Sequence, residues 1–341
     1  MSVTPQQDVP FPHWEAELDS PSLQGNMATD ISRDRPSKDA VQRLMKTFLK
    51  ENSSYDVLPV SYRLIVLDTK LLVKKALAVM MQNGVVSAPL WDAEAHHFAG
   101  MLTVSDFINL IQYYYTHSSV ESALQDIDTF QIQHMRMVEK TIGAPPRQLL
   151  SIHPMSTLYD ACKLLVESRS HRIPLIDRDS ATGQELIASV LTQHRILRFI
   201  AMNFKHTRCL VQPLSELRIG IYENLATAKL STPVIQVINM FVERKISSVP
   251  IVDDRGAVLN VYETVDVMSI ARSQKYHELD IPVGQALQAR PADYPGVHTC
   301  TLNDTLASIF AIIRKRKVYR LIVIDGDNKL KGIVSLSDIL R

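Results

Sequence analysis

Three aspartates occupy equivalent places in a repeated pattern, and each could accept hydrogen bonds. Asp106, Asp266 and Asp338 each follow an apolar, strand-like run and open a helix-like segment, whereas Arg195 has the same place in the remaining copy. An acidic residue in the first turn of a helix commonly caps backbone N–H groups and complements the helix dipole. A carboxylate can also accept hydrogen bonds from both hydroxyls of a ribose, as in dinucleotide-binding folds. Both uses remain open for these aspartates.

Two arginines lie at matched places from which they could bind phosphate. Arg172 and Arg320 begin equivalent strand-like runs, and His171 and Tyr319 precede them. A single arginine at a strand end is usually solvated, but the guanidinium fork suits bidentate contact with phosphate, so a matched pair favours a phosphate site. The other candidate cations of this cluster are His194, Arg195, Lys245 and Arg314.

Patterns typical of catalysis or of metal binding are missing from the sequence. His206-x-x-Cys209 and His298-x-Cys300 each offer two ligands without a matching second pair, which is short of a zinc site. The sequence has no Gly-x-Ser-x-Gly, Walker loop, dinucleotide-binding glycine motif or kinase catalytic set. We therefore expect a protein that is not an enzyme and holds no metal.

The candidate residues recur because the chain repeats one supersecondary unit four times. Each copy reads as an amphipathic helix, an apolar strand ending in Asp, a turn, a second strand and a helix start. The first strands cover residues 86–92, 172–177, 248–253 and 320–325. Each opening helix has apolar residues at i, i+3, i+4 and i+7, the spacing of one buried face. One unit cannot bury both faces of its sheet, so we expect an α/β (α+β) fold in which the units pair into two modules.

The predicted boundaries follow from where this pattern starts and stops. Residues 1–38 are rich in proline without an apolar period, which is typical of a disordered or loosely docked tail. The first module covers 39–204, with repeats at about 55–117 and 148–203, and the second covers 205–341, with repeats at about 224–275 and 296–341. A helix is expected over 38–50, a strand over 62–67 and a helical insert over 118–143. The chain ends three residues after Asp338, so the last helix should be short.

The composition bounds the partners of the chain. Its 341 residues are 46% hydrophobic and 21% charged, as in ordinary globular proteins. A formal net charge of +1 argues against a broad nucleic-acid surface, so any anion site must be local. Three widely spaced cysteines suit a reducing compartment, and no apolar run approaches the roughly 20 residues of a membrane span. Without a secretory signal, we expect a soluble protein of the cytoplasm and nucleus that binds neither nucleic acid nor membrane.

The four copies resemble cystathionine-β-synthase-type (CBS) repeats, which pair into Bateman modules. A single copy is a weak motif, but four in register are specific. Shorter segments are similar to the gamma regulatory subunit family of AMP-activated protein kinase, including the relatives in the sucrose-nonfermenting kinase complex of yeasts. These segments are Ser-Tyr-Asp-Val-Leu-Pro at 54–59, Ser-Ala-Pro-Leu-Trp-Asp at 87–92, Gly-Met-Leu-Thr-Val-Ser-Asp-Phe-Ile at 100–108 and His-Thr-Cys at 298–300. The resemblance covers about residues 40–341.

This resemblance implies a non-catalytic subunit that senses AMP, ADP and ATP. It implies two tandem Bateman modules that form a disk with pseudo-symmetry. The partners it implies are the catalytic alpha subunit and the bridging beta subunit of a heterotrimeric serine/threonine kinase. In such a complex the gamma subunit couples energy or glucose status to kinase activity. The segment 53–67 would be the edge with which the beta subunit pairs. The alternative is a stand-alone CBS protein that binds another adenosyl ligand and regulates a different enzyme or transporter.

The resemblance also assigns roles to residues. The aspartates Asp106, Asp266 and Asp338 would hold ribose, and the copy with Arg195 would lack an equivalent site. Other nucleotide-binding groups would supply hydroxyls, although serine and threonine at these places could equally cap helices. These groups are Thr103, Ser105, Thr192, Thr232, Ser247, Tyr319, Ser335 and Ser337.

Overall fold

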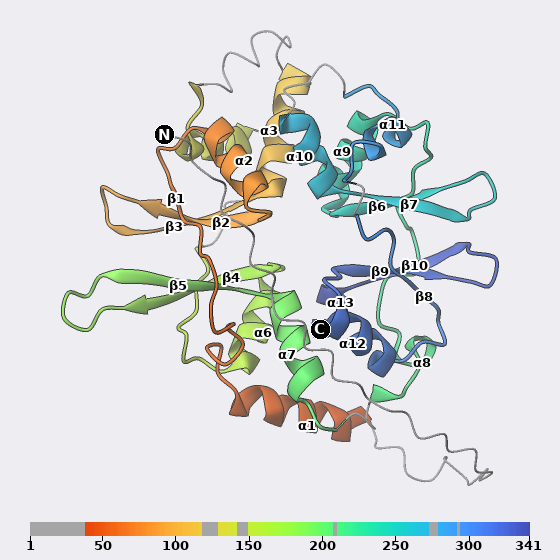
Figure 1. Ribbon diagram of the computed structural model, residues 1–341, viewed down its shortest axis with the longest axis horizontal. Coiled ribbons are helices and arrows are strands. Elements are labelled where there is room, and N and C mark those ends of the chain that lie inside the picture. Colours follow the sequence, from red (N-terminus) through yellow and green to blue (C-terminus); the bar gives the residue numbers. More distant parts are fainter. Residues whose placement is uncertain (1–37, 118–128, 142–148, 207–209, 273–278, 292–293) are drawn as a thin grey trace, which may run out of the picture. The chain divides into compact units, whose positions relative to one another are not determined.

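The computed structural model in Figure 1 describes residues 38–117, 129–141, 149–206, 210–272, 279–291 and 294–341. Residues Pro36–Arg341 form one unit of the chain and Met1–Arg35 another. The tail predicted over 1–38 lies outside the described residues except for Lys38, and so does much of the helical insert predicted over 118–143. All of the described helices and strands belong to the larger unit.

Four copies of one helix–hairpin–helix unit account for most of the described residues, which confirms the repeat predicted from the sequence. The opening helices are α2 (Val73–Gln82), α6 (Leu158–Glu167), α9 (Val234–Arg244) and α12 (Leu306–Lys315). The hairpins are β2 (Ser87–Asp92) with β3 (His97–Thr103), β4 (Arg172–Arg178) with β5 (Glu185–Thr192), β6 (Ser248–Val252) with β7 (Val258–Glu263), and β9 (Arg320–Ile324) with β10 (Leu330–Ser335). The closing helices are α3 (Val104–His117), α7 (Gln193–Asn203), α10 (Thr264–Arg272) and α13 (Leu336–Leu340).

A short parallel segment precedes each opening helix and pairs with the first strand of the hairpin. In copies one and four it is a strand, β1 (Leu67–Asp68) or β8 (Thr299–Cys300). In copies two and three it is a single bridge, from Ile152 to Leu175 or from Ala228 to Ile251. The remaining helices are α1 (Lys38–Glu51), η2 (Ile132–His134), α5 (Met135–Thr141), α8 (Leu214–Leu217) and α11 (Val283–Leu287).

The strand predicted over 62–67 is wrong except at its last residue. Residues 62–66 are irregular, and the hydroxyl of Tyr62 donates to the backbone carbonyl of Ala188 instead. An alternating apolar pattern indicates a strand only where one face is buried. Tyr62 is 38% exposed and Val66 is 40% exposed, so the alternation does not bury a face here.

The register of the hairpins places the candidate residues of each copy side by side. The first residue of each hairpin pairs with the residue that ends its second strand, immediately before the closing helix. These pairs are Ser87 with Thr103, Arg172 with Thr192, Ser248 with Glu263, and Arg320 with Ser335. In copies two and four, the predicted phosphate ligands Arg172 and Arg320 therefore neighbour the predicted hydroxyl groups of Thr192 and Ser335.

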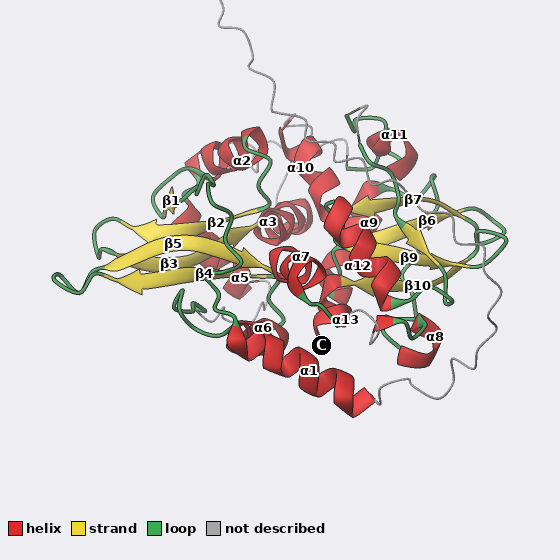
Figure 2. Cartoon of the chain, turned by 60° about the horizontal axis from the view of Figure 1, so that its bottom comes forward, coloured by secondary structure: helices red, strands yellow, loops and turns green. Residues whose placement is uncertain are grey.

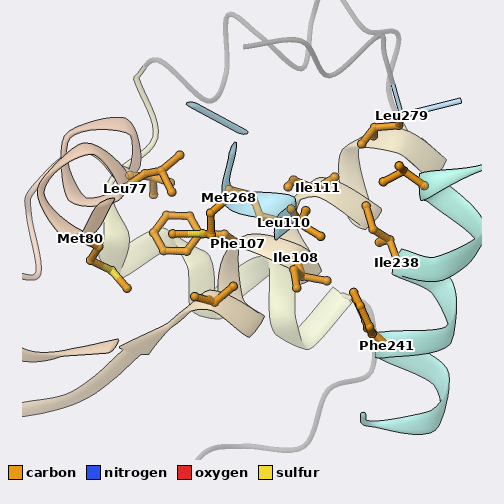
Figure 3. Close-up of a cluster of buried hydrophobic side chains, with 14 of the residues drawn as sticks. Leu77, Met80, Phe107, Ile108, Leu110, Ile111, Ile238, Phe241, Met268 and Leu279 are labelled. Atoms are coloured by element: carbon orange, nitrogen blue, oxygen red, sulfur yellow. The ribbon is translucent and has the colours of Figure 1, made fainter. Parts of the chain in front are cut away.

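Two hydrophobic clusters form the core, and each combines copies that are not consecutive in the sequence. One contains α2 and α3 of copy one with α9 and α10 of copy three. The other contains α6 and α7 of copy two with α12 and α13 of copy four, together with residues of α1. In Figure 3 the side chains of Phe107, Ile108 and Ile111 on α3 lie among those of the neighbouring helices. The predicted apolar faces are buried, although Leu306 of α12 is only half-buried.

Copies one and two contact each other through their hairpins instead, and so do copies three and four. The backbone N–H of Phe98 in β3 donates to the carboxylate of Glu185 in β5 at 3.0 Å, and Ala257 bridges to Lys329 between the hairpins of copies three and four. In Figures 1 and 2 the helices α3, α7, α10 and α12 lie between the hairpins of copies one and two and those of copies three and four. The boundary at residue 204 between two modules stays a prediction.

No helix in the described part of the chain is long and apolar enough to cross a membrane.

Candidate functional site

All three candidate aspartates cap the helix that they open, and each uses one carboxylate oxygen to do so. In each case Oδ2 accepts a hydrogen bond from the backbone N–H three residues earlier. The donors are Thr103 for Asp106 at 2.6 Å, Glu263 for Asp266 at 2.7 Å and Ser335 for Asp338 at 2.8 Å. Capping and ligand binding therefore do not exclude each other, because a carboxylate has a second oxygen. The three copies differ in what surrounds that second oxygen.

Asp338 is half-buried and has an available oxygen. Its Oδ2 accepts hydrogen bonds from the backbone N–H and the hydroxyl of Ser335, the latter at 2.6 Å. Its Oδ1 accepts no hydrogen bond from any residue that the structure describes, and no described cation forms an ion pair with it. The carboxylate is close enough to Tyr222 to add to the rise in the pKa of that phenol, which burial causes in the first place.

Asp266 has both oxygens occupied by Arg290, which follows α11. The Nε of Arg290 lies 2.7 Å from Oδ1, and its Nη2 lies 2.6 Å from Oδ2. The two side chains are 9% and 10% exposed, so this is a buried, bidentate ion pair. Burial raises the pKa of Asp266, and the contact with Arg290 opposes that rise.

Glu263 binds the candidate phosphate ligand Arg320. The Nη1 of Arg320 forms an ion pair with the Glu263 carboxylate, and its Nη2 donates to the hydroxyl of Ser247 at 3.1 Å. Tyr294 donates from its hydroxyl to the other carboxylate oxygen of Glu263 at 2.9 Å. These contacts join copies three and four on the side of the hairpins where the closing helices begin.

A second group joins copies two and four. The hydroxyl of Ser337 lies 3.0 Å from Oε1 of Gln193 and 3.3 Å from Nδ1 of His171. Burial lowers the pKa of His171, and the positive charges of Arg172 and Arg320 lower it further. The positive charges of both matched arginines therefore act on the ionisation of His171.

The aromatic and histidine side chains beside this group come from the same two copies. The rings of His194 and Tyr319 lie 6.0 Å apart, and burial lowers the pKa of His194. Burial also lowers the pKa of the Arg172 guanidinium, whereas the adjacent phenol of Tyr319 raises it. The site thus combines arginines with histidines that are held neutral near pH 7.

Other predicted site residues are not brought to this group by any described contact. The Nη1 of Arg195 donates to the carbonyl of Val190 at 2.8 Å, and its guanidinium lies over the ring of Tyr62. Lys245 and Arg314 are exposed. The hydroxyls of Thr192 and Thr232 accept local backbone hydrogen bonds, Ser105 is exposed, and Thr103 donates to Asp106. Their roles in binding stay predictions.

Four contributors were missed by the reasoning from sequence: Gln193, Glu263, Arg290 and Tyr294. Glu263 had a visible signal, because the other three copies have Thr or Ser at the equivalent place. Arg290 and Tyr294 belong to the linker between copies three and four, where no repeat suggests a role.

A metal centre is not formed by the residues described, among which no three His, Cys, Asp or Glu side chains are grouped to hold an ion. The two described cysteines, Cys162 and Cys300, are free and buried, and burial raises the pKa of both thiols to about 12.

The fold and the repeated hairpins define a protein of the CBS class. The family model described as "CBS domain" matches residues 142–202, 219–272 and 293–341. These stretches cover copies two, three and four, and the structure gives copy one the same order of elements. A structure of an archaeal protein from Methanocaldococcus jannaschii has the same fold, with a TM-score of 0.63 over 84% of this chain and 98% of the other at 13% identity.

Two yeast proteins resemble the chain over nearly its whole length. The 5'-AMP-activated protein kinase subunit gamma of Kluyveromyces lactis is 51% identical over 303 residues, which are 89% of this chain and 91% of the relative. The subunit of that name from Saccharomyces cerevisiae is 47% identical over 302 residues, 89% of this chain and 92% of the relative. The chain belongs to the family of gamma subunits of 5'-AMP-activated protein kinase. This membership confirms the family and the non-catalytic role predicted from the sequence, over the stand-alone alternative.

Proposed function

We propose that the chain binds AMP, ADP and ATP and, as a gamma subunit, passes nucleotide occupancy to a kinase. The observation that carries the proposal is the half-buried Asp338, which has an oxygen that no described residue contacts and which lies in the same helix turn as Ser337. Ser337 contacts His171, whose pKa is lowered by burial and, to a smaller extent, by the charges of Arg172 and Arg320. The contact between Ser337 and His171 supports this proposal, because it joins the helix turn of Asp338 to the strand start that bears Arg172.

The ribose is expected at Asp338. The cap uses Oδ2, and Oδ1 can accept a hydrogen bond from a ribose hydroxyl while the helix stays capped. Ser335 belongs to the cap, and Ser337 is placed to contact the ligand.

The phosphates are expected at the arginines. A phosphate monoester has about −1.5 to −2 charges near pH 7, which matches two guanidinium groups. AMP, ADP and ATP share their adenosine and differ in phosphate number, so fixed arginines could discriminate among them.

Sensing also requires a partner that contacts the nucleotide-bound and nucleotide-free forms of the chain differently. A partner with equal affinity for the two forms could not respond to nucleotide binding. We propose a catalytic alpha subunit and a bridging beta subunit for this role. The irregular segment before β1 is the proposed contact of the beta subunit. It exposes 60% of Tyr55 and all of Val60, and its backbone from 62 to 66 pairs with no described strand.

Isothermal titration calorimetry on the full chain tests the proposal with AMP, ADP, ATP and S-adenosylmethionine. Asp338→Ala should weaken AMP binding at least about tenfold, the effect of losing a hydrogen bond to a charged group. Asp304→Ala is the matched control, because Asp304 also caps through Oδ2, from the N–H of Thr301 at 2.7 Å, in the same copy. Equal losses in both variants, or tighter binding of S-adenosylmethionine than of AMP, would count against the proposal. Co-purification of a kinase and a bridging subunit with the tagged chain tests the partners.

A further inference from the structure

The predicted ribose sites at Asp266 and Asp338 differ in what contacts the carboxylate. Asp266 accepts two hydrogen bonds from Arg290 and one from the backbone of Glu263. Asp338 accepts hydrogen bonds from its cap alone among the residues described. The two copies have the same fold and register, so the difference comes from Arg290.

The guanidinium of Arg290 occupies the place that a ribose would need. It presents two parallel N–H donors to the two oxygens of Asp266, and a ribose diol would present two O–H donors to the same atoms. The ribose hydroxyls and the guanidinium cannot donate to Asp266 from this direction at the same time. While Arg290 is bound, each carboxylate oxygen lacks room for a second donor on that side.

Arg290 is itself held firmly in this position. Its Nη1 donates to the side-chain oxygen of Asn260 at 2.9 Å, and its Nη2 donates to the backbone carbonyl of Val261. The ring of Tyr294 lies 4.0 Å from the guanidinium carbon. Both neighbours on the hairpin, Asn260 and Val261, belong to β7, which leads directly into α10 and Asp266.

We propose that Arg290 is a built-in competitor that closes the Asp266 pocket, so that a nucleotide binds there only after displacing the arginine. This inference rests on the proposed function, and it assigns unequal affinities to the two pockets: open at Asp338 and closed at Asp266. Tyr294 extends the closure, because it contacts Arg290 and also donates to Glu263, the partner of Arg320. Release of Arg290 therefore also loosens the contact that holds Arg320.

The test follows the Asp266 site by calorimetry with AMP in an Asp338→Ala background, in which the candidate Asp106 is unchanged in every variant compared. Adding Arg290→Ala should tighten AMP binding about tenfold or more. The apparent affinity scales with the fraction of molecules whose site is open, and we expect Arg290 to leave the Asp266 site open in about one molecule in ten or fewer. Adding Asp266→Ala as well should abolish that gain. Arg244→Ala is the matched control: Arg244 also donates to a backbone carbonyl, that of Asn224 at 3.1 Å, but it contacts no carboxylate among the residues that the structure describes.

The outcomes separate the inference from the function on which it depends. Unchanged or weaker AMP binding by the Arg290→Ala variant would overturn the inference, since Arg290 would then be a neutral or helpful part of the pocket. Failure of the unsubstituted chain to bind AMP at all would instead overturn the proposed function. Circular dichroism checks that each variant is folded. If Arg290→Ala is not, Arg290→Lys keeps the charge without the fork and should give a smaller gain in the same direction.

Discussion

Removing Arg290 should also destabilise the ligand-free protein, by an amount that depends on Asp266 being ionised. Arg290→Ala leaves a carboxylate that is 9% exposed without its cation. Breaking a buried ion pair by removing one partner costs about 3–5 kcal/mol, and we take about 3 kcal/mol because the backbone N–H of Glu263 still contacts Asp266. At about 2 °C per kcal/mol for a unit of this size, the melting temperature should fall by about 6 °C.

The pH dependence distinguishes lost charge pairing from lost packing. Burial raises the pKa of Asp266, and without Arg290 only the backbone N–H of Glu263 still opposes that rise. The folded variant then binds more protons than the unfolded chain, so its stability falls as pH rises through the raised pKa and recovers as pH falls toward the ordinary value of 3.8. The penalty relative to the unsubstituted chain should therefore be larger at pH 7.5 than at pH 5.

Urea unfolding followed by circular dichroism measures this penalty at both pH values. The matched double variant Asp266→Asn/Arg290→Ala should cost about 1 kcal/mol, because it leaves no buried charge. A penalty below about 1 kcal/mol for Arg290→Ala alone, or one that the Asn substitution does not reduce, would refute the reasoning about the buried pair.

Three further predictions concern the phosphate group and the core. Glu263→Ser places a hydroxyl residue where the other copies have Thr or Ser, and it removes the carboxylate that pairs with Arg320. ATP affinity should then rise about tenfold relative to AMP affinity, because each additional phosphate charge near Arg320 contributes about 1–2 kcal/mol. An unchanged ratio of the two affinities in competition calorimetry would contradict this prediction. Because the folded pKa of His171 lies below its ordinary 6.5, the ligand-free chain should lose stability as pH falls below that value. A bound phosphate should raise the pKa of His171 again, so AMP binding near pH 6 should be accompanied by uptake of a proton. Calorimetry in buffers of different ionisation enthalpy would detect this uptake, and His171→Asn should abolish it. Ile238→Ala, at a fully buried position, should cost about 3 kcal/mol in urea unfolding, whereas the exposed Leu230→Ala should change little.

Local patterns were enough to predict the units of the fold. The spacing of Val73, Ala76, Leu77 and Met80 predicts the buried face of α2, and those four residues are the buried ones. The same reasoning failed at 62–66, because alternation reports burial only where another element covers one face. Which helices pack together could not be predicted either: copy one shares its cluster with copy three, and such a choice depends on tertiary contacts between distant segments.

The candidate site was predicted where copies could be compared. Arg172 and Arg320 occupy equivalent register positions, each opposite the last residue of its hairpin. Glu263 is acidic where the other three copies have Thr or Ser, and this difference lets it form an ion pair with Arg320. Arg290 lies in a linker without a counterpart, so comparing copies could not reveal it.

The caps explain why equivalent aspartates can have different surroundings. A helix cap needs one oxygen of the aspartate, so the fold fixes that oxygen in copies one, three and four alike. The second oxygen is left to residues outside the repeated unit. For Asp338 no described residue uses it, whereas for Asp266 a linker arginine does. If Arg290 competes with ribose as proposed, substitutions in the linker between copies three and four should change nucleotide binding without altering any repeat.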